Sequence, residues 1–236
     1  MWADMSVAII TGASRGLGLA LAEALAQRGW GLVLTARGAD ALEEVAGKLR
    51  KRTRVTAIAG DVADDAHRVA LVCAAWDLGG LDLLVNNASA LGAEPLVRLE
   101  HLPLIGLREA LETNVVAPLG LVQQALPLLR DSRGTVLNIS SDAAVEAYPT
   151  WGGYGSSKAA LEQLSAVLAE EEPDLRVWWV DPGDMRTALY AAACPDDDLS
   201  DRPVPEQVVP AFLDLLDRGA ASGRYSAPAL LAGAAS

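Results

Sequence analysis

The chain has 236 residues, of which 51% are hydrophobic, and its formal net charge at pH 7 is −12. This length and apolar content predict a single domain, residues 1–236, with a sizeable buried core. The negative charge argues against nucleic acids and anionic membrane surfaces as partners, because both attract clustered Lys and Arg.

Cysteine and histidine are scarce. Cys73 and Cys194 stand far apart and outside any CxxC arrangement, so neither a disulfide framework nor a zinc site is expected. His67 and His101 are isolated, and we expect both on the surface rather than on a metal. Residues 1–14 hold no basic segment, and no apolar run reaches the roughly 18 residues of a membrane span. We therefore expect a cytoplasmic protein without a metal.

Short β-branched apolar runs alternate with longer Ala/Leu-rich segments along most of the chain. Continuous apolar strands separated by helices predict a doubly wound, Rossmann-type α/β fold, with a parallel sheet covered on both faces. Ligands are expected at the carboxyl ends of the strands. The expected strands are 6–11, 31–36, 54–61, 81–87, 134–141 and 175–183; the expected helices are 15–29, 40–52, 104–130, 154–172 and 205–219.

The first expected strand runs into TGASRGLG, which places Gly12, Gly16 and Gly18 at a turn and at the start of a helix. Glycine lets the backbone approach a pyrophosphate, and a helix N-terminus supplies free N–H groups and a positive dipole. After the first strand of a βαβ array this pattern favours a dinucleotide site. The alternative is a tight strand–helix turn that uses glycine only structurally.

The second expected strand ends with Ala36 and is followed by Arg37. NAD-specific folds usually carry an acidic residue here, which binds the ribose 2′-hydroxyl. Arg15 lies in the glycine loop, so two guanidinium groups and no carboxylate are expected near one ribose. They suit a 2′-phosphate and favour NADP(H). The alternative is that both are ordinary surface arginines.

Six short motifs follow one another in the chain: TGASRGLG, GDV at 60–62, NNA at 86–88, NV at Asn114, NISS, and YGSSK at 154–158. In their order and spacing, over about residues 6–187, the chain resembles the short-chain dehydrogenase/reductases, in particular the compact single-domain members that prefer NADP(H). The resemblance implies a carbonyl reductase or alcohol dehydrogenase that transfers a hydride between nicotinamide and a carbonyl or secondary alcohol.

The same resemblance implies a catalytic set. Tyr154 would be the general acid/base, and Lys158, one helical turn later, would favour its phenolate through positive charge. An unperturbed phenol has a pKa of about 10, which is too high for efficient exchange near neutrality. Ser141 would hydrogen-bond the substrate oxygen, with Ser140 the weaker candidate. The alternative is a capped surface helix with a chance Ser–Tyr–Lys set.

Asn114 matches the fourth member of the set, whose main-chain carbonyl holds a water in a proton relay to the lysine. Pro118 has no N–H and cannot bond the carbonyl four residues earlier, so that carbonyl stays available if the helix continues. The alternative is that Pro118 ends a helix and the relay is arranged differently.

The remaining implied residues surround the cofactor. Asp61 and Val62 resemble the pair near the adenine ring, Asn87 and Ala88 the wall beside the cofactor, and residues 182–187 the segment that holds the carboxamide. Asn86 and Asn87 have a purely structural alternative as strand-end caps. The full expected cofactor set is Gly12, Ser14, Arg15, Gly16, Leu17, Gly18, Arg37, Asp61, Val62, Asn87, Ala88, Tyr154, Lys158, Pro182, Gly183, Met185 and Thr187.

Two departures from the family pattern stand out. Ser89 occupies the position after NNA that is usually glycine in the family, and a side chain there could narrow the cofactor or substrate space. The usual C-terminal strand and its DGG-like ending are missing, although residues 223–228 could supply a short edge strand. Because the family often builds tetramers through this edge, we expect a homodimer through the helices at 104–130 and 154–171.

The sequence says least about the residues that bind the substrate. Tyr148 and Trp151 are expected to line the pocket, and aromatic walls suit a cyclic or apolar carbonyl compound. Residues 184–205 are expected to form a lid, whose acidic run 196–198 either attracts a cation or is a solvated loop face. A non-catalytic NADP-binding regulator or scaffold with this fold is the alternative function. The complete catalytic set argues against it.

Overall fold

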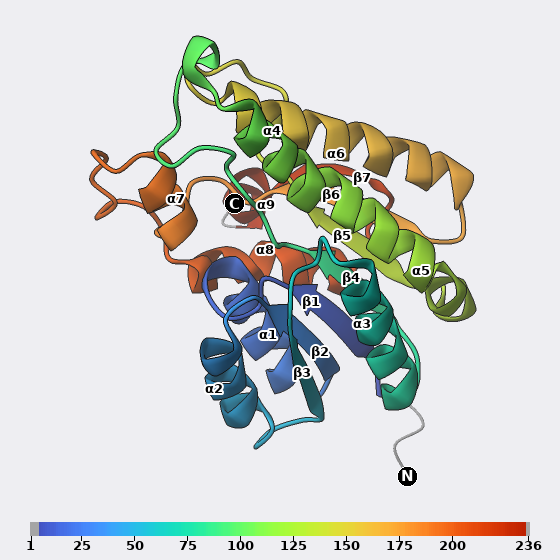
Figure 1. Cartoon of the computed structure of the whole chain (residues 1–236). Coiled ribbons are helices and arrows are strands. Elements are labelled where there is room, and N and C mark those ends of the chain that lie inside the picture. The colour runs from blue at the N-terminus through green and yellow to red at the C-terminus, as the bar shows by residue number, and fades with distance from the viewer. Residues whose placement is uncertain (1–4, 235–236) are drawn as a thin grey trace.

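The computed structural model describes residues 5–234. Within this range the strands form one parallel sheet in the order β3-β2-β1-β4-β5-β6-β7 (Figure 1). The strand order reverses between β1 and β4, and a crevice for ligands is expected beyond the carboxyl ends of these two strands. The strands are β1 (Val7–Thr11), β2 (Gly31–Ala36), β3 (Val55–Ala59), β4 (Leu83–Asn86), β5 (Thr135–Ile139), β6 (Arg176–Asp181) and β7 (Gly223–Ser226).

Helices cover both faces of the sheet (Figure 1). Successive strand residues point to opposite faces, so Ile10 packs in the cluster with Phe212 of α8, while Ile9 packs with Leu121 of α5. Burial on both sides explains the uninterrupted apolar runs of the strands. The helices are α1 (Gly16–Gln27), α2 (Ala39–Leu49), α3 (Asp65–Leu78), α4 (Leu104–Leu111), α5 (Ala117–Ser132), α6 (Gly152–Glu171), α7 (Ala188–Ala193), α8 (Pro205–Asp217) and α9 (Ala227–Ala234). None of these described helices is long and apolar enough to cross a membrane.

The helical stretch expected over 104–130 is built in three pieces, because a π-helical segment, Glu112–Val116, joins α4 to α5. The N–H of Ala117 donates to the carbonyl of Glu112, five residues back, and Pro118 has no N–H to donate. The carbonyls of Thr113 and Asn114 therefore lack their ordinary helical donors. The helix continues through Pro118, which is the first of the two alternatives that the sequence allowed.

The C-terminal strand is present, although the sequence pattern suggested that it was missing. Residues Gly223–Ser226 form β7, which pairs with β6 so that Trp178 lies opposite Gly223. The buried Trp178 indole donates to the carbonyls of Ala220 and Ala221 at 3.0 and 3.1 Å. The sequence signal for this strand is weak because it has only four residues and no apolar run, and the short edge strand considered for residues 223–228 is the correct alternative.

His67 is buried, contrary to the surface position expected for it. Its Nε2 lies 2.7 Å from the Thr35 hydroxyl oxygen, and its ring stands directly against Gly60, where a side chain would collide with it. Burial lowers the pKa of His67. An isolated histidine carries no sequence signal for such packing, because Thr35 and Gly60 are brought to it only by the sheet. His101 is exposed, as expected.

We expect Trp178→Phe to lower the free energy of unfolding by about 2 kcal/mol, because the buried Ala220 carbonyl and the partly buried Ala221 carbonyl lose their donor and a small void opens. The matched control is Trp76→Phe on α3, where the side chain is 67% exposed and the change should stay within about 0.5 kcal/mol. Urea unfolding followed by circular dichroism measures both, and equal effects of the two substitutions would contradict the role given to Trp178.

Candidate active site

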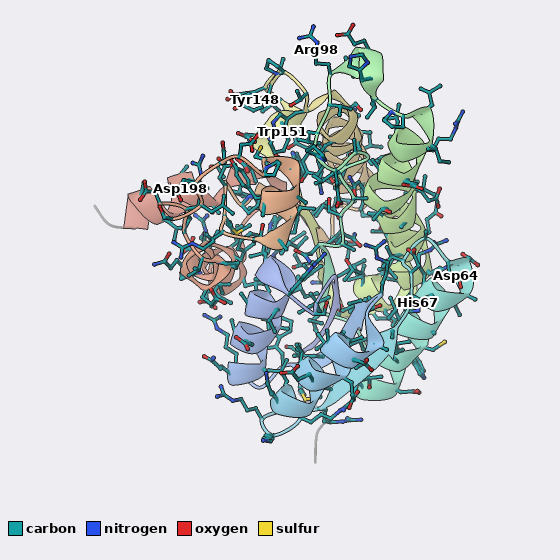
Figure 2. The ribbon with its side chains drawn as sticks, turned by 60° about the vertical axis from the view of Figure 1, so that its left-hand side comes forward. Asp64, His67, Arg98, Tyr148, Trp151 and Asp198 are labelled. Carbon is teal, nitrogen blue, oxygen red and sulfur yellow. The ribbon has the colours of Figure 1, made fainter. Side chains whose placement is uncertain are left out.

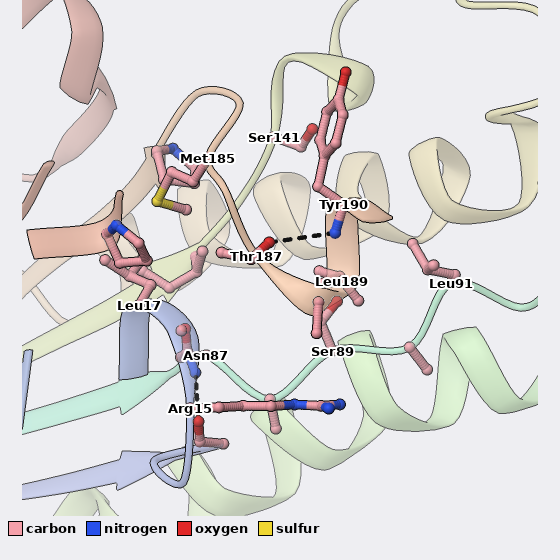
Figure 3. A pocket seen from close by; sticks show the side chains of 18 of the residues that line it. Arg15, Leu17, Asn87, Ser89, Leu91, Ser141, Met185, Thr187, Leu189 and Tyr190 are labelled. Carbon is pink, nitrogen blue, oxygen red and sulfur yellow. Dashed lines mark hydrogen bonds between the residues drawn. The ribbon is translucent and has the colours of Figure 1, made fainter. Parts of the chain in front are cut away.

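A cavity of about 780 Å³ opens at the carboxyl ends of the central strands. Figure 3 looks into it, with Arg15 and Asn87 toward one end and Ser141 and Tyr190 toward the other. Most of the site residues expected from the sequence meet here. They are Gly12, Ser14, Arg15, Gly16, Leu17, Arg37, Asp61, Val62, Asn87, Ala88, Ser141, Trp151, Tyr154, Lys158, Pro182, Gly183, Met185 and Thr187.

The turn after β1 leaves room for a ligand at the start of α1. Gly12 and Gly16 have φ of +67° and +58°, a conformation that favours glycine. A Cβ on Gly12 would lie 2.8 Å from the Asn87 amide nitrogen, which donates to the Thr11 carbonyl at 2.8 Å and fixes the turn. No described side chain caps the N-terminus of α1, so its N–H groups and positive dipole face the cavity. The turn therefore fits a phosphate group.

Gly18 packs against this turn and does not line the cavity. A Cβ there would lie 2.5 Å from the Gly12 carbonyl oxygen, so only glycine lets α1 pack this closely against the turn. The expected cofactor role of Gly18 is thus indirect. Asn86, one of the two asparagines with a structural alternative, donates to the Asn138 side chain at 2.8 Å in the interior.

Arg15 and Arg37 follow neighbouring strand ends. Thr11 of β1 pairs with Thr35 of β2, and the N–H of Ala13 donates to the Thr35 carbonyl at 3.0 Å, which joins the two loops. Both arginines line the cavity, and no carboxylate follows β2 directly. Two guanidinium groups at this edge suit a phosphate on the ribose better than a free 2′-hydroxyl.

Tyr154 and Lys158 lie one turn apart on α6 and are almost completely buried, at 6% and 2% exposed. The Lys158 ammonium donates to the Ile139 carbonyl at 2.7 Å, and its Nζ lies 5.5 Å from the centroid of the Tyr154 ring. This contact fixes α6 against the end of β5. The two side chains therefore form part of the cavity wall and do not lie on a solvated helix face.

Burial dominates the electrostatics of this pair. It lowers the pKa of Lys158 to about 8. It also raises the pKa of Tyr154 well above its ordinary value, and the carboxylates of Asp181 and Asp142 raise it further, whereas a hydrogen bond with Ser89 lowers it. The sequence suggested a phenolate favoured by Lys158, but in the folded chain desolvation outweighs that effect. Tyr154 is thus held as a phenol, the form that donates a proton.

Ser141 and its neighbour Ser140 have different surroundings. The Ser141 hydroxyl donates to the Asp142 carboxylate at 3.0 Å and lines the cavity. The buried Ser140 hydroxyl donates to Glu162 at 2.5 Å. Arg224 of β7 pairs with Glu162 and donates to the Ser141 carbonyl at 3.3 Å. Both serines line the cavity, but the Ser140 hydroxyl is buried against Glu162, whereas the Ser141 hydroxyl bonds only its neighbours Asp142 and Ala143.

Asn114 stands behind the cavity wall. Its side-chain amide donates to the Ala90 carbonyl and to Ser157 Oγ, both at 2.8 Å, and its Oδ1 accepts from the Ala90 N–H at 2.8 Å. The π-helical segment leaves its main-chain carbonyl without the ordinary helical donor, as described above. The side chain thus holds the loop after β4 in place.

An aromatic wall closes the substrate end. The Trp151 ring meets the Tyr154 ring edge-on at 5.8 Å between centroids and lies 6.5 Å from the Tyr190 ring of α7. Leu91 and Ala193 pack beside them. Sequence reasoning did not single out Tyr190 and Leu91, because only the fold brings the lid and the loop after β4 to this wall.

Tyr148 does not line the cavity, contrary to expectation. It is 39% exposed, and its hydroxyl lies 3.0 and 2.9 Å from the carboxylates of Asp142 and Glu146 (Figure 2). Proximity in sequence to Trp151 suggested a shared wall, but the loop carries the Tyr148 ring outward.

The expected lid, 184–205, contains α7 and a loop held by arginines. Arg186 donates to the Leu199 carbonyl at 3.1 Å, and Arg202 pairs with Asp184 at 3.4 Å. The acidic run 196–198 is exposed and lies outside the cavity (Figure 2). Of the two interpretations of this run, the structure favours the solvated loop face.

Residues 6–198 match the sequence model of the short chain dehydrogenase family. The chain belongs to this family. It is 37% identical over 172 residues to the rhamnolipid-biosynthesis 3-oxoacyl-[acyl-carrier-protein] reductase of Pseudomonas aeruginosa, covering 70% of this chain and 66% of that protein.

Solved structures of the family resemble the chain closely. A Shigella flexneri short chain dehydrogenase complexed with NADP has a TM-score of 0.88 and 27% identity, over 97% of this chain and 100% of that one. An alcohol dehydrogenase of Thermococcus sibiricus complexed with 5-hydroxy-NADP has a TM-score of 0.86 and 29% identity, over 94% and 96% of the two chains. The chain is thus a short-chain oxidoreductase whose structural neighbours bind NADP.

Because burial lowers the pKa of Lys158, its contribution to stability should depend on pH. Between about pH 8 and the ordinary value of 10.5, the unfolded chain holds a proton at Lys158 that the folded chain has lost. Rising pH therefore favours the folded state in this window, by up to about 1.4 kcal/mol per pH unit. We expect the Lys158→Met variant to lack this rise in the free energy of unfolding with pH. Urea unfolding of both proteins across the window measures it, and parallel pH dependences would contradict the assignment.

Proposed function

We propose that the chain is an NADP(H)-dependent oxidoreductase that interconverts a carbonyl compound and a secondary alcohol, with Tyr154 as the general acid/base. The observation that carries the proposal is the meeting, in one cavity, of the α1 glycine turn and two arginines with Ser141, Tyr154 and Lys158. The nicotinamide, when bound, donates or accepts the hydride. The protein supplies position and protons.

The cofactor would be held along the strand ends. The uncapped N-terminus of α1 suits the pyrophosphate, and Arg15 and Arg37 suit the 2′-phosphate of NADP(H). Asp61 and Val62 line the cavity after β3 and would lie beside the adenine ring, as the family resemblance implies. NADP in one structural neighbour and 5-hydroxy-NADP in another support the same choice of cofactor.

The proton would move at Tyr154. In carbonyl reduction its O–H bond breaks and the proton passes to the substrate oxygen, which the Ser141 hydroxyl holds. The raised pKa of Tyr154 keeps this proton in place until the oxygen gains negative charge. Lys158, whose pKa is about 8, stays largely cationic at neutral pH and favours the phenolate that is left.

The substrate would lie against the aromatic wall of Trp151 and Tyr190 and the Leu91 side chain beside it. These side chains suit an apolar or cyclic carbonyl compound. A non-catalytic NADP-binding regulator, the alternative function that the sequence allows, would not need Tyr154 and Lys158 buried together at the carboxyl ends of the strands. Their burial therefore supports the enzyme.

We expect Tyr154→Phe to lower turnover by about 10²- to 10⁴-fold, because the proton donor is lost, with NADPH affinity nearly unchanged. NADPH consumption against a panel of ketones, aldehydes and imines measures turnover, and fluorescence titration measures binding. The matched control is Tyr148→Phe, which removes a hydroxyl outside the cavity and should leave turnover intact. Full activity of Tyr154→Phe would refute the mechanism; NADPH binding without any turnover by the wild type would favour the regulator.

We expect Arg37→Asp to weaken NADPH roughly 10- to 100-fold relative to NADH, because a charge-assisted bond to the 2′-phosphate is replaced by repulsion. The ratio of kcat/KM for the two cofactors measures the effect. Arg52→Asp makes the same charge change at an exposed position outside the cavity and should leave the ratio unaltered. If Arg37→Asp weakened both cofactors equally, the arginine assignment would be wrong.

A further inference from the structure

The chain that leaves β5 is held by two successive turns of α6. The Ile139 carbonyl accepts from the Lys158 ammonium at 2.7 Å, and the buried Ser140 hydroxyl donates to the Glu162 carboxylate at 2.5 Å. Tyr154, Lys158 and Glu162 follow one another at intervals of four residues, so they lie on one face of the helix. The helix face that carries Tyr154 therefore also fixes the start of the segment after β5.

Arg224 of the edge strand β7 extends this contact to Ser141. Its Nε lies 3.0 and 3.1 Å from the two carboxylate oxygens of Glu162, and its Nη2 donates to the Ser141 carbonyl at 3.3 Å. A planar guanidinium has several N–H donors in fixed directions, so one arginine can bond both partners at once. Arg224 thus joins β7, α6 and Ser141 through a single side chain.

The Ser141 hydroxyl has no such tie of its own. It donates to the Asp142 carboxylate at 3.0 Å and accepts from the Ala143 N–H at 3.2 Å. Neither partner belongs to α6, so these two bonds do not connect Ser141 to the helix that carries Tyr154. Glu162 and Arg224 supply that connection.

We infer that Glu162 and Arg224 are positioning residues, which place the Ser141 hydroxyl relative to Tyr154 so that both reach one substrate oxygen. The inference rests on the proposed function. Neither residue lines the cavity, so both act through Ser141 and its backbone rather than on the substrate. Such placement matters because a shift of about 1 Å in a reacting group can lower a rate by about 10²-fold.

The experiment is a double-mutant cycle that introduces Arg224→Met into the wild type and into Ser141→Ala. The measured quantity is kcat/KM for a carbonyl substrate that the wild type reduces with NADPH. We expect Arg224→Met to lower kcat/KM about tenfold in the wild type and less than about twofold in Ser141→Ala, where the hydroxyl that it places is gone. The affinity for NADPH, measured by fluorescence titration, should stay the same in all four proteins.

Two variants of Glu162 and one surface control complete the set. Glu162→Leu removes the acceptor of Ser140 and Arg224 and should match Arg224→Met, whereas Glu162→Gln keeps an acceptor oxygen and should stay within about threefold of the wild type. Arg28→Met breaks the pair between Arg28 and Asp217, which joins α1 to α8 at 2.9 Å outside the cavity. The Arg28 side chain is 36% exposed and that of Arg224 31%, and Arg28→Met should leave kcat/KM unchanged.

Wild-type kcat/KM in Arg224→Met would overturn the inference. An equal fold-loss in both backgrounds would do the same, because the loss would then come from the missing charge or from general loosening and not through Ser141. Should Arg224→Met fail to fold, Arg224→Lys keeps the charge without the planar fork, and its loss of about threefold should likewise disappear in Ser141→Ala. All these outcomes leave the proposed function standing, whereas a wild type that turns over no carbonyl compound or alcohol would refute both.

Discussion

The bond from the buried Lys158 ammonium to the Ile139 carbonyl is the contact around which the site is built. It joins α6 to the carboxyl end of β5, and so places Tyr154 at the same edge of the sheet as the glycine turn after β1. Removal of both side chains from water moves their pKa values in opposite directions, down for the amine and up for the phenol. A proton donor and a cation therefore coexist at neutral pH as neighbouring buried side chains.

Proline and polar loop contacts complete this arrangement. The missing N–H of Pro118 and the π-helical segment before it free the carbonyl at Asn114 from the ordinary helical pattern. The Asn114 side chain meanwhile clamps the loop after β4 through Ala90. On the other side, Arg224 reaches from the edge strand β7 to Glu162 and to the Ser141 carbonyl. The loop after β4 and the segment at Ser141 are thus held from both directions by polar contacts.

Much of this could be predicted from the sequence, since the glycine turn, the alternation of strands and helices and the Ser–Tyr–Lys set depend on local pattern and motif spacing. The predictions failed where tertiary packing decides. A four-residue edge strand such as β7 has so little pattern that its presence stayed one of two alternatives, and the burial of His67 depends on Gly60, which the sheet brings to it. The Tyr148 side chain turns outward through its loop. The rise in the pKa of Tyr154 comes from desolvation, which a four-residue spacing to a lysine does not reveal.

The central claim is that Tyr154 exchanges a proton with the substrate oxygen beside the bound nicotinamide. The most direct test is a crystal structure of the chain with NADP⁺ and a bound secondary alcohol or unreactive analogue. The account predicts the substrate oxygen within hydrogen-bond reach, about 2.6–3.2 Å, of both the Tyr154 and Ser141 hydroxyls. A substrate oxygen bound away from both hydroxyls, or a Tyr154 ring directed out of the cavity, would contradict it.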